Sequence, residues 1–195
     1  MNPTPRRVLL FSGHRVDAPG RAKPRFPADK VPIAAREIES LLDRLGADAH
    51  DLALTQGAAG GDLLFAEACV KRGVRVQLLL PFAEDEFIRQ SILPSADGEG
   101  WRMRYLAVKA LLGDAPRVMA DELGASPANM NAFECCNVWL LASALEYGQR
   151  EHEKVHLICL WDGGGGDGPG GTSHMVDEVK RHGGQVSWLD TRRLW

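Results

Sequence analysis

The chain has little of what marks secreted, membrane-spanning or nucleic-acid-binding proteins. Its formal net charge is -3, and no apolar run reaches the roughly 18 to 20 residues that cross a bilayer. The apolar run that follows Met1 to Arg7 is too short for a secretory signal. We therefore expect a cytoplasmic protein with no membrane partner, and the acidic balance argues against nucleic acid as a partner.

Cysteine is also scarce, with four in 195 residues and no Cys-x-x-Cys pair. All four lie within apolar stretches that read as helix or strand, at positions 69, 135, 136 and 159. This spacing excludes a disulfide framework and a zinc cage, so we predict reduced thiols that pack as small hydrophobic groups.

What the chain does have is the composition of a folded domain, with 45% hydrophobic and 25% charged residues. We expect one domain spanning residues 1–195 with a full hydrophobic core. Short apolar runs alternate with helical patterns, which predicts an α/β fold with a mainly parallel sheet and helices on both faces. The expected strands are 8–11, 52–55, 74–80, 155–161 and 185–189, and the expected helices are 31–45, 63–72, 129–147 and 172–182.

Two stretches are less regular. Residues 16–30 are rich in Pro, Gly and basic side chains, which predicts an exposed loop long enough to act as a lid. Residues 84–123 predict helices near 84–92 and 101–112, a loop at 97–100 and a short strand at 117–119.

Three loops of unusual composition follow predicted strands. They are Ser12-Gly13-His14-Arg15, the stretch from Gln56 to Asp62 with Gly57, Gly60 and Gly61, and Gly168-Pro169-Gly170-Gly171-Thr172. Because parallel strands end on one edge of their sheet, these loops can meet over one crevice.

The glycines and the helix starts that follow them would present backbone amides and positive dipole ends to a phosphate group. Ser12 and Arg15 would add a hydrogen bond and charge, and Thr172 would serve as a cap or a phosphate donor. Tight turns explain each glycine loop equally well when it is taken alone. Neither glycine loop matches the dinucleotide fingerprint or the Walker A pattern, which argues against a conventional NAD enzyme or P-loop NTPase.

These three motifs, with Glu67 on the helix after the second, resemble the Rossmann-like superfamily that joins the DNA-processing protein A domain to the lysine-decarboxylase-like (LOG) proteins. The resemblance implies a nucleotide-like ligand and a homodimer or larger assembly. It also implies the LOG activity, hydrolysis of the N-glycosidic bond of nucleoside monophosphates. In that branch a catalytic glutamate closely follows a Pro-Gly-Gly-x-Gly-Thr loop, but here the first downstream acids are Asp177 and Glu178. This departure favours the binding or sensing branch.

Other motifs compete with this interpretation. His152-Glu153-Lys154-Val155-His156 matches the zinc-protease pattern, but His156 falls in a predicted strand, whereas that chemistry needs both histidines on one helix. Asn131, Glu134 and Asn137 recur every three residues, which indicates either a ligand-facing or a solvated helix face. Asp162 and Asp167 could hold a divalent ion, yet local turn bonds explain them better. The five tryptophans are predicted to pack in the core, with Trp101 and Trp195 the least clear.

We therefore predict a module that binds a nucleotide-like ligand at Ser12, Gly13, Arg15, the loop 57–62 and residues 168–172, with no metal or cofactor. The alternative is a nucleotide N-glycosidase in which Asp62, Glu134 or Glu178 is the catalytic acid. An interaction domain without a small ligand is the third possibility.

Overall fold

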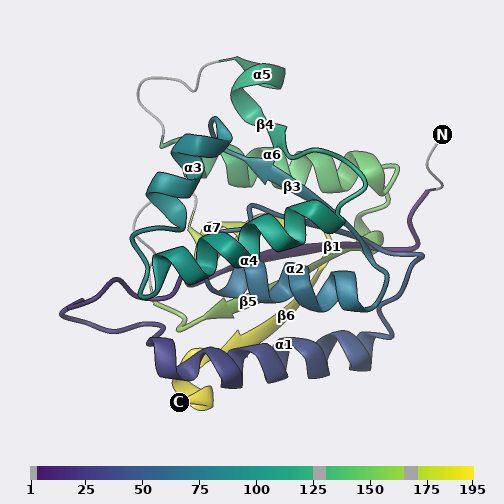
Figure 1. Cartoon of the computed structure of the whole chain (residues 1–195). Coiled ribbons are helices and arrows are strands. Elements are labelled where there is room, and N and C mark those ends of the chain that lie inside the picture. Colours follow the sequence, from purple (N-terminus) through teal and green to yellow (C-terminus); the bar gives the residue numbers. More distant parts are fainter. Residues whose placement is uncertain (1–3, 125–130, 165–170) are drawn as a thin grey trace.

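A six-stranded sheet forms the centre of the structure (Figure 1). The computed structural model describes residues 4–124, 131–164 and 171–195. The strand order is β4-β3-β2-β1-β5-β6, and each neighbouring pair is parallel, which confirms the predicted α/β class. The strands are β1 (Val8–Gly13), β2 (Leu52–Thr55), β3 (Arg75–Leu80), β4 (Arg117–Val118), β5 (Val155–Trp161) and β6 (Gln185–Asp190).

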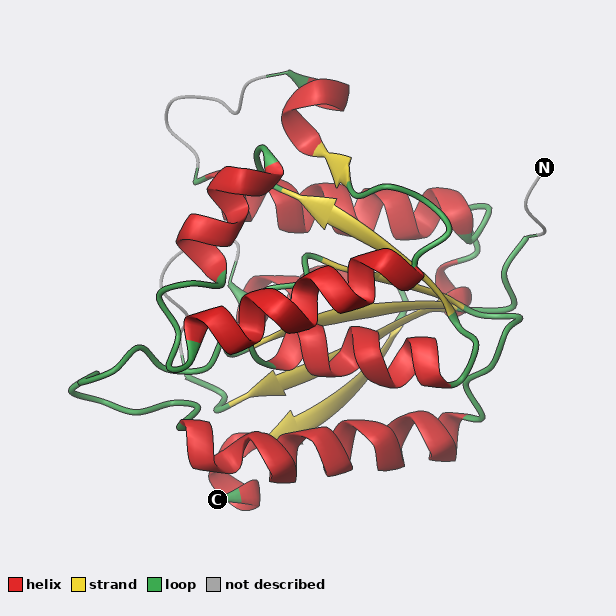
Figure 2. Ribbon diagram, in the orientation of Figure 1, coloured by secondary structure: helices red, strands yellow, loops and turns green. Residues whose placement is uncertain are grey.

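Helices cover both faces of this sheet, as predicted. In Figure 2, α1, α2 and α4 lie over one face, and α6 and α7 lie over the other. None of the described helices is long and apolar enough to cross a membrane. The helices are α1 (Val31–Leu45), α2 (Gly61–Lys71), α3 (Glu84–Ser91), α4 (Gly98–Leu111), α5 (Met119–Leu123), α6 (Ala132–Tyr147), α7 (Thr172–Arg181) and α8 (Thr191–Leu194), with 3-10 turns η1 (Ala28–Lys30) and η2 (His152–Lys154).

The core divides into two layers because successive strand residues point to opposite faces. In β1, Leu9 and Phe11 pack on the side of α1 and α2, whereas Val8 and Leu10 pack on the side of α6 and α7. The helices bury matching stripes. In α1, for example, Ala34, Ile38, Leu41 and Leu42 are buried at helical spacing.

Three of the four cysteines belong to these layers. Cys69, Cys136 and Cys159 are buried, Cys135 is half-buried, and all four are free thiols, as predicted. Burial raises the pKa of the Cys159 thiol to about 12 and also raises those of Cys69 and Cys136. These three thiols therefore stay protonated and unreactive at neutral pH.

Several predicted boundaries were wrong, each next to a glycine. Ser12 and Gly13 end β1 instead of beginning a loop, and Gly61 and Asp62 already belong to α2. The predicted loop at 97–100 is the start of α4, where the Asp97 side chain accepts a hydrogen bond from the Gly100 amide. Glycine in the first turn of a helix resembles a loop when only the sequence is read.

The sheet order reverses at β1. Strands β2, β3 and β4 extend to one side of it, and β5 and β6 extend to the other. The chain therefore leaves the carboxyl ends of β1 and β5 in different directions, which opens a crevice at this edge of an α/β sheet. Ligands commonly bind at such switch points.

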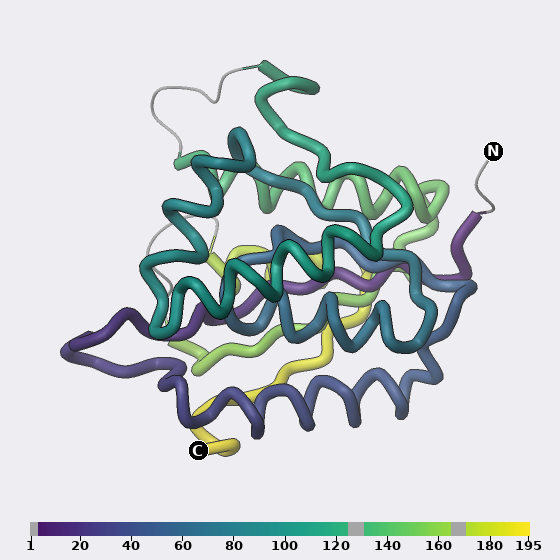
Figure 3. Tube along the Cα trace, viewed as in Figure 1, coloured from purple at the N-terminus to yellow at the C-terminus, as the bar shows by residue number. Residues whose placement is uncertain are grey.

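The connection from β1 to η1 projects from this edge as the long purple loop in Figure 3. The tip of this loop is exposed as predicted, but its base is buried. The Asp17 carboxylate accepts hydrogen bonds from the amides of Arg25 and Phe26, both at 2.9 Å. Phe26 is itself buried and stacks on Trp195, with ring centroids 5.3 Å apart. The predicted lid is thus anchored at both ends of its base.

Candidate functional site

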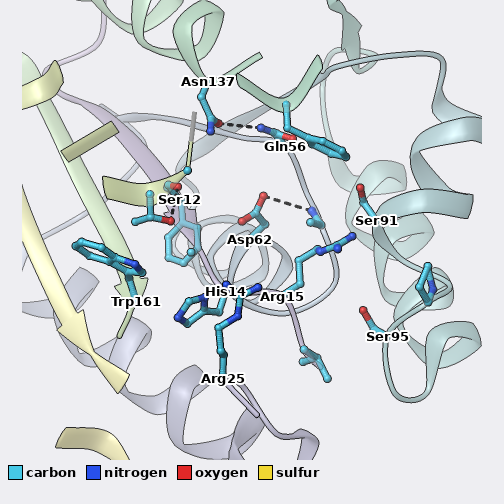
Figure 4. A pocket seen from close by; sticks show the side chains of 18 of the residues that line it. Ser12, His14, Arg15, Arg25, Gln56, Asp62, Ser91, Ser95, Asn137 and Trp161 are labelled. Carbon is cyan, nitrogen blue, oxygen red and sulfur yellow. Dashed lines mark hydrogen bonds between the residues drawn. The ribbon is translucent and has the colours of Figure 1, made fainter. Parts of the chain in front are cut away.

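A cavity of about 300 Å³ lies at the carboxyl ends of β1 and β5, where the sheet order reverses. We call it the switch-point cavity. Its walls come from the end of β1 and the loop that follows, the turn before α2, the end of α3 and the starts of α6 and α7. Figure 4 shows their side chains. Segments that are far apart in the sequence therefore converge, as the motif analysis required.

Three arginines line one side of the cavity, and we call Arg15, Arg21 and Arg25 the basic wall. All three lie in the connection between β1 and η1. The Arg15 guanidinium donates to the Gln90 carbonyl at 2.7 Å, which holds it against the end of α3. Two carboxylates, Asp62 and Glu134, line the same cavity, so its balance of charged side chains is positive.

The end of β1 supplies two further polar groups. The Ser12 and Thr172 hydroxyls are 3.1 Å apart, which ties β1 to the start of α7. The Asp162 amide donates to Nε2 of His14 at 3.2 Å, and the Asp162 carboxylate lies 3.4 Å from the same nitrogen. Burial lowers the pKa of His14 and outweighs the nearby Asp162 carboxylate, which is consistent with a neutral ring.

Gly13 also lines the cavity, and close packing between β1 and β5 explains why this residue is a glycine. A Cβ at this position would lie 2.8 Å from the Leu160 carbonyl oxygen, so any side chain would push β1 away from β5.

The turn before α2 differs from its predicted role as a phosphate cradle. The amides of Gly57 and Ala58 donate to Oδ2 of Asp62, at 3.2 and 3.4 Å. The Ala59 amide donates to the Ser91 carbonyl, and the Gly61 amide donates to the His14 carbonyl. These four amides are therefore occupied within the protein, and Asp62 fills the position that we had assigned to a phosphate.

The glycines of this turn allow its backbone to pack closely against β1 and the loop that follows β1. Gly60 has φ 114, and a Cβ there would lie 2.7 Å from the Val16 nitrogen. A Cβ on Gly61 would lie 2.8 Å from the Phe11 ring. Gly57, Gly60 and Gly61 are not among the residues that line the cavity, but Asp62 is.

Asp62 is the most strongly perturbed acid of the site. Burial raises its pKa from an ordinary value of 3.8 to about 6, although the Ala58 amide, the Thr55 hydroxyl, the Gly57 amide and the charge of Arg15 act in the opposite direction. This carboxyl group therefore changes its charge near neutral pH, which is common at functional sites.

The start of α7 lies at the cavity, as the sequence predicted. Gly171 and Thr172 line the cavity, and the N-cap of α7 is Gly171 instead of Thr172, and makes no side-chain cap. First-turn amides have no partner within their own helix, so they remain suited to an anion. Gly168 and Gly170, which we also predicted to bind the ligand, lie outside the described residues.

Helix α6 forms a further wall of the switch-point cavity. Asn131, Glu134 and Asn137 all line the cavity, so this polar face is turned to the cavity instead of being only a solvated surface. Gln56 donates to Oδ1 of Asn137 at 2.9 Å, which joins α6 to the end of β2. Asn131 caps α6, where its side chain accepts from the Phe133 amide at 2.8 Å.

The structure does not bring Glu178, the third candidate acid, into this group. Its carboxylate lies 2.5 Å from Arg181, and His174 and His182 flank it at 3.8 and 3.7 Å. Glu178 does not line the cavity, so Asp62 and Glu134 are the candidate acids that do.

The competing motifs lie elsewhere. His152 is in the 3-10 turn η2 and His156 is in β5, so the two do not share a helix. Among the described residues, no group of three His, Cys, Asp or Glu side chains could hold a metal ion. Trp101 and Trp139 are buried as expected, but Trp188 is 47% exposed, so its predicted place in the core was wrong.

Sequence reasoning missed several residues of the cavity. Arg21 and Arg25 were seen only as part of a basic loop, Gln56 was named only as the start of the second loop, and Ser91 carried no motif. They lie here because the loop after β1 folds back over the sheet edge and α3 ends beside the turn before α2. Only the clustering of arginines at 21 and 25 could have signalled this wall.

Comparison with known proteins adds little to this geometry. No protein family model matches the chain, and no curated protein sequence matches it. Among solved structures, the Moco carrier protein from Chlamydomonas reinhardtii is similar over 96% of this chain and 91% of its own, at 13% identity and a TM-score of 0.36. A match this weak carries no argument about the site, and the resemblance to the LOG superfamily stays a prediction.

Proposed function

We propose that the chain binds a nucleotide or related phosphate-bearing ligand in the switch-point cavity and acts as a sensor or regulatory module. This proposal is supported chiefly by one observation: the basic wall and the start of α7, whose N-cap Gly171 makes no side-chain cap, line the same cavity. Guanidinium groups bind phosphate through charge-assisted hydrogen bonds, and helix N-termini present free N–H groups and a positive dipole end to anions. The Ser12 and Thr172 hydroxyls lie beside them as further hydrogen-bonding groups.

The direct test measures binding of nucleoside monophosphates and inorganic phosphate by calorimetry and by thermal shift. A ligand that binds only the folded state raises the unfolding temperature by mass action. Arg25→Ala should weaken binding about tenfold, because it removes a charged hydrogen-bond donor from the basic wall.

Arg36→Ala is the matched control, since Arg36 is an exposed arginine on α1 that does not line the cavity. It should leave the affinity unchanged. Absence of any shift with phosphate compounds at millimolar concentration would favour an interaction domain without a small ligand.

One observation favours a hydrolase as the second candidate. Asp62 and Glu134 both line the cavity, and Asp62 has its pKa raised toward neutrality, as a general acid would require. This candidate predicts release of free base from a nucleoside monophosphate, lost in Glu134→Gln. If no base is released while the nucleotide binds, the sensor role stands.

The cellular location and assembly remain proposals of the same kind. We place the protein in the cytoplasm and expect a homodimer or larger assembly from the resemblance. Light scattering after size exclusion tests the assembly.

A further inference from the structure

The carboxylate of Asp62 has two different oxygen environments. Its Oδ2 accepts hydrogen bonds from the amides of Gly57 and Ala58. The side chain nevertheless lines the switch-point cavity, with 8% of the residue exposed. In Figure 4 the dashed bond leaves one oxygen, and the other oxygen lies on the side of Ser12. The backbone amides therefore fix one oxygen, and the Thr55 hydroxyl is a further hydrogen-bond donor to this carboxyl group. A carboxylate has about four lone-pair sites, so it can still accept a hydrogen bond from a ligand in the cavity.

This carboxylate determines which part of a ligand can lie beside it. An ionised carboxylate accepts hydrogen bonds and repels a phosphate group. A phosphate held at the basic wall and the start of α7 must then keep its distance from Asp62, and the ligand must present a hydrogen-bond donor there. In phosphorylated sugars and nucleotides, the sugar hydroxyls are the donors that lie a few bonds from the phosphate.

A second group in the cavity also needs a partner. Ser91 is fully buried, at 0% exposure, and lines the cavity. Its hydroxyl has no hydrogen-bond partner among the described residues. A buried hydroxyl without a partner costs free energy, and a polar ligand in this cavity would supply one. Ser91 is thus a second polar residue of the cavity lining, besides Asp62, whose side chain has hydrogen-bonding capacity left.

We infer that the ligand carries a hydroxylated pentose beside its phosphate, and that a sugar hydroxyl donates to Asp62. The inference rests on the proposed function, because the phosphate position orients the sugar. It makes Asp62 a specificity residue that selects ribose over deoxyribose. A site built to bond a hydroxyl rejects the analogue that lacks it.

The experiment compares the affinities of purified protein for AMP, 2'-deoxy-AMP, 3'-deoxy-AMP, ribose 5-phosphate and inorganic phosphate at pH 7.5. The wild-type chain should bind AMP at least about tenfold more tightly than one of the deoxy forms, as expected for a hydrogen bond to a charged group. Ribose 5-phosphate should bind more tightly than inorganic phosphate, which separates the sugar contribution from that of the base.

Asp62→Asn sharpens the test because it keeps the shape of the side chain. Its remaining oxygen can still accept from the Gly57 and Ala58 amides, while the new NH2 group replaces the acceptor that faces the cavity. We expect this variant to bind AMP and the deoxy forms within about twofold of each other and to retain phosphate binding. Asp114→Asn, an exposed aspartate that does not line the cavity, should keep the wild-type ratio.

The outcomes separate the two proposals. Equal affinity of the wild type for AMP and for both deoxy forms overturns the role of Asp62 and leaves phosphate binding intact. Discrimination that persists unchanged in Asp62→Asn also overturns it. If no phosphate compound binds the wild type, the proposed function fails and this inference fails with it. Should Asp62→Asn not fold, the wild-type ratio alone decides.

Discussion

The helix starts of α2 and α7 look alike in sequence but differ in the structure. Both follow a glycine-rich turn after a parallel strand, and both contribute to the switch-point cavity. At α2 the chain supplies its own anion, because the Asp62 carboxylate takes the Gly57 and Ala58 amides. Each helix has a glycine N-cap that makes no side-chain cap, and what distinguishes the two starts is that the first turn of α7 contains no acid. The difference teaches that an acid in the first helical turn can occupy the nearby amides itself. The site then offers a ligand a hydrogen-bond acceptor instead of a place for an anion.

The glycines of the two turns differ in the same way. Gly60 has φ 114, a conformation that L side chains rarely adopt, whereas Gly171 has φ -67 and ψ 179, which any residue can adopt. The glycines before α2 are required by the fold. Gly171, before α7, is not required by its backbone conformation.

The largest expected effect is on the free energy of unfolding of Gly60→Ala. We expect a loss of about 3 kcal/mol or more, because the new Cβ combines backbone strain with a clash 2.7 Å from the Val16 nitrogen. Gly171→Ala should lose less than about 1 kcal/mol. Urea unfolding followed by circular dichroism measures both. Equal losses would remove the distinction between the two turns.

The second prediction is that the free energy of unfolding depends on pH through the protonation of Asp62. Between an ordinary pKa of 3.8 and its folded value of about 6, the native state binds more protons here than the unfolded state. Wild-type stability therefore falls as pH rises through this window, and Asp62→Asn lacks this component. The difference in unfolding free energy between variant and wild type should shift in favour of the variant by about 2 kcal/mol from pH 4 to pH 7. A pH-independent difference would contradict the raised pKa.

A smaller effect is expected on ligand affinity at the start of α7. Gly171→Val places a branched side chain where the phosphate would approach the first-turn amides, so binding of AMP should weaken at least about tenfold. Gly113→Val is the control, because a Cβ there meets nothing within 4 Å and lies away from the cavity. Calorimetry at fixed salt measures both variants. Undiminished affinity in Gly171→Val would place the phosphate elsewhere.

The fold could be predicted largely from the sequence because the signals were local. The buried run of β1 and the helical stripe of α1 each specify their own element. The convergence of Ser12, Asp62 and Thr172 also followed, since parallel strands share their carboxyl edge. The sequence could not predict which group each backbone amide binds, because whether the Asp62 carboxylate turns back onto Gly57 depends on side-chain geometry. Ser91 carried no pattern and reached the site only through the packing of α3.

The stack of Phe26 on Trp195 connects the last residue of the chain to the base of the loop that carries Arg21 and Arg25. An affinity tag fused after Trp195 would thus begin next to this loop, whereas β1 starts at the opposite edge of the sheet, as Figure 1 shows. Binding measurements are best made with a tag at the amino terminus. For the same reason, a movement of this loop when the cavity fills would change the surroundings of the Trp195 indole.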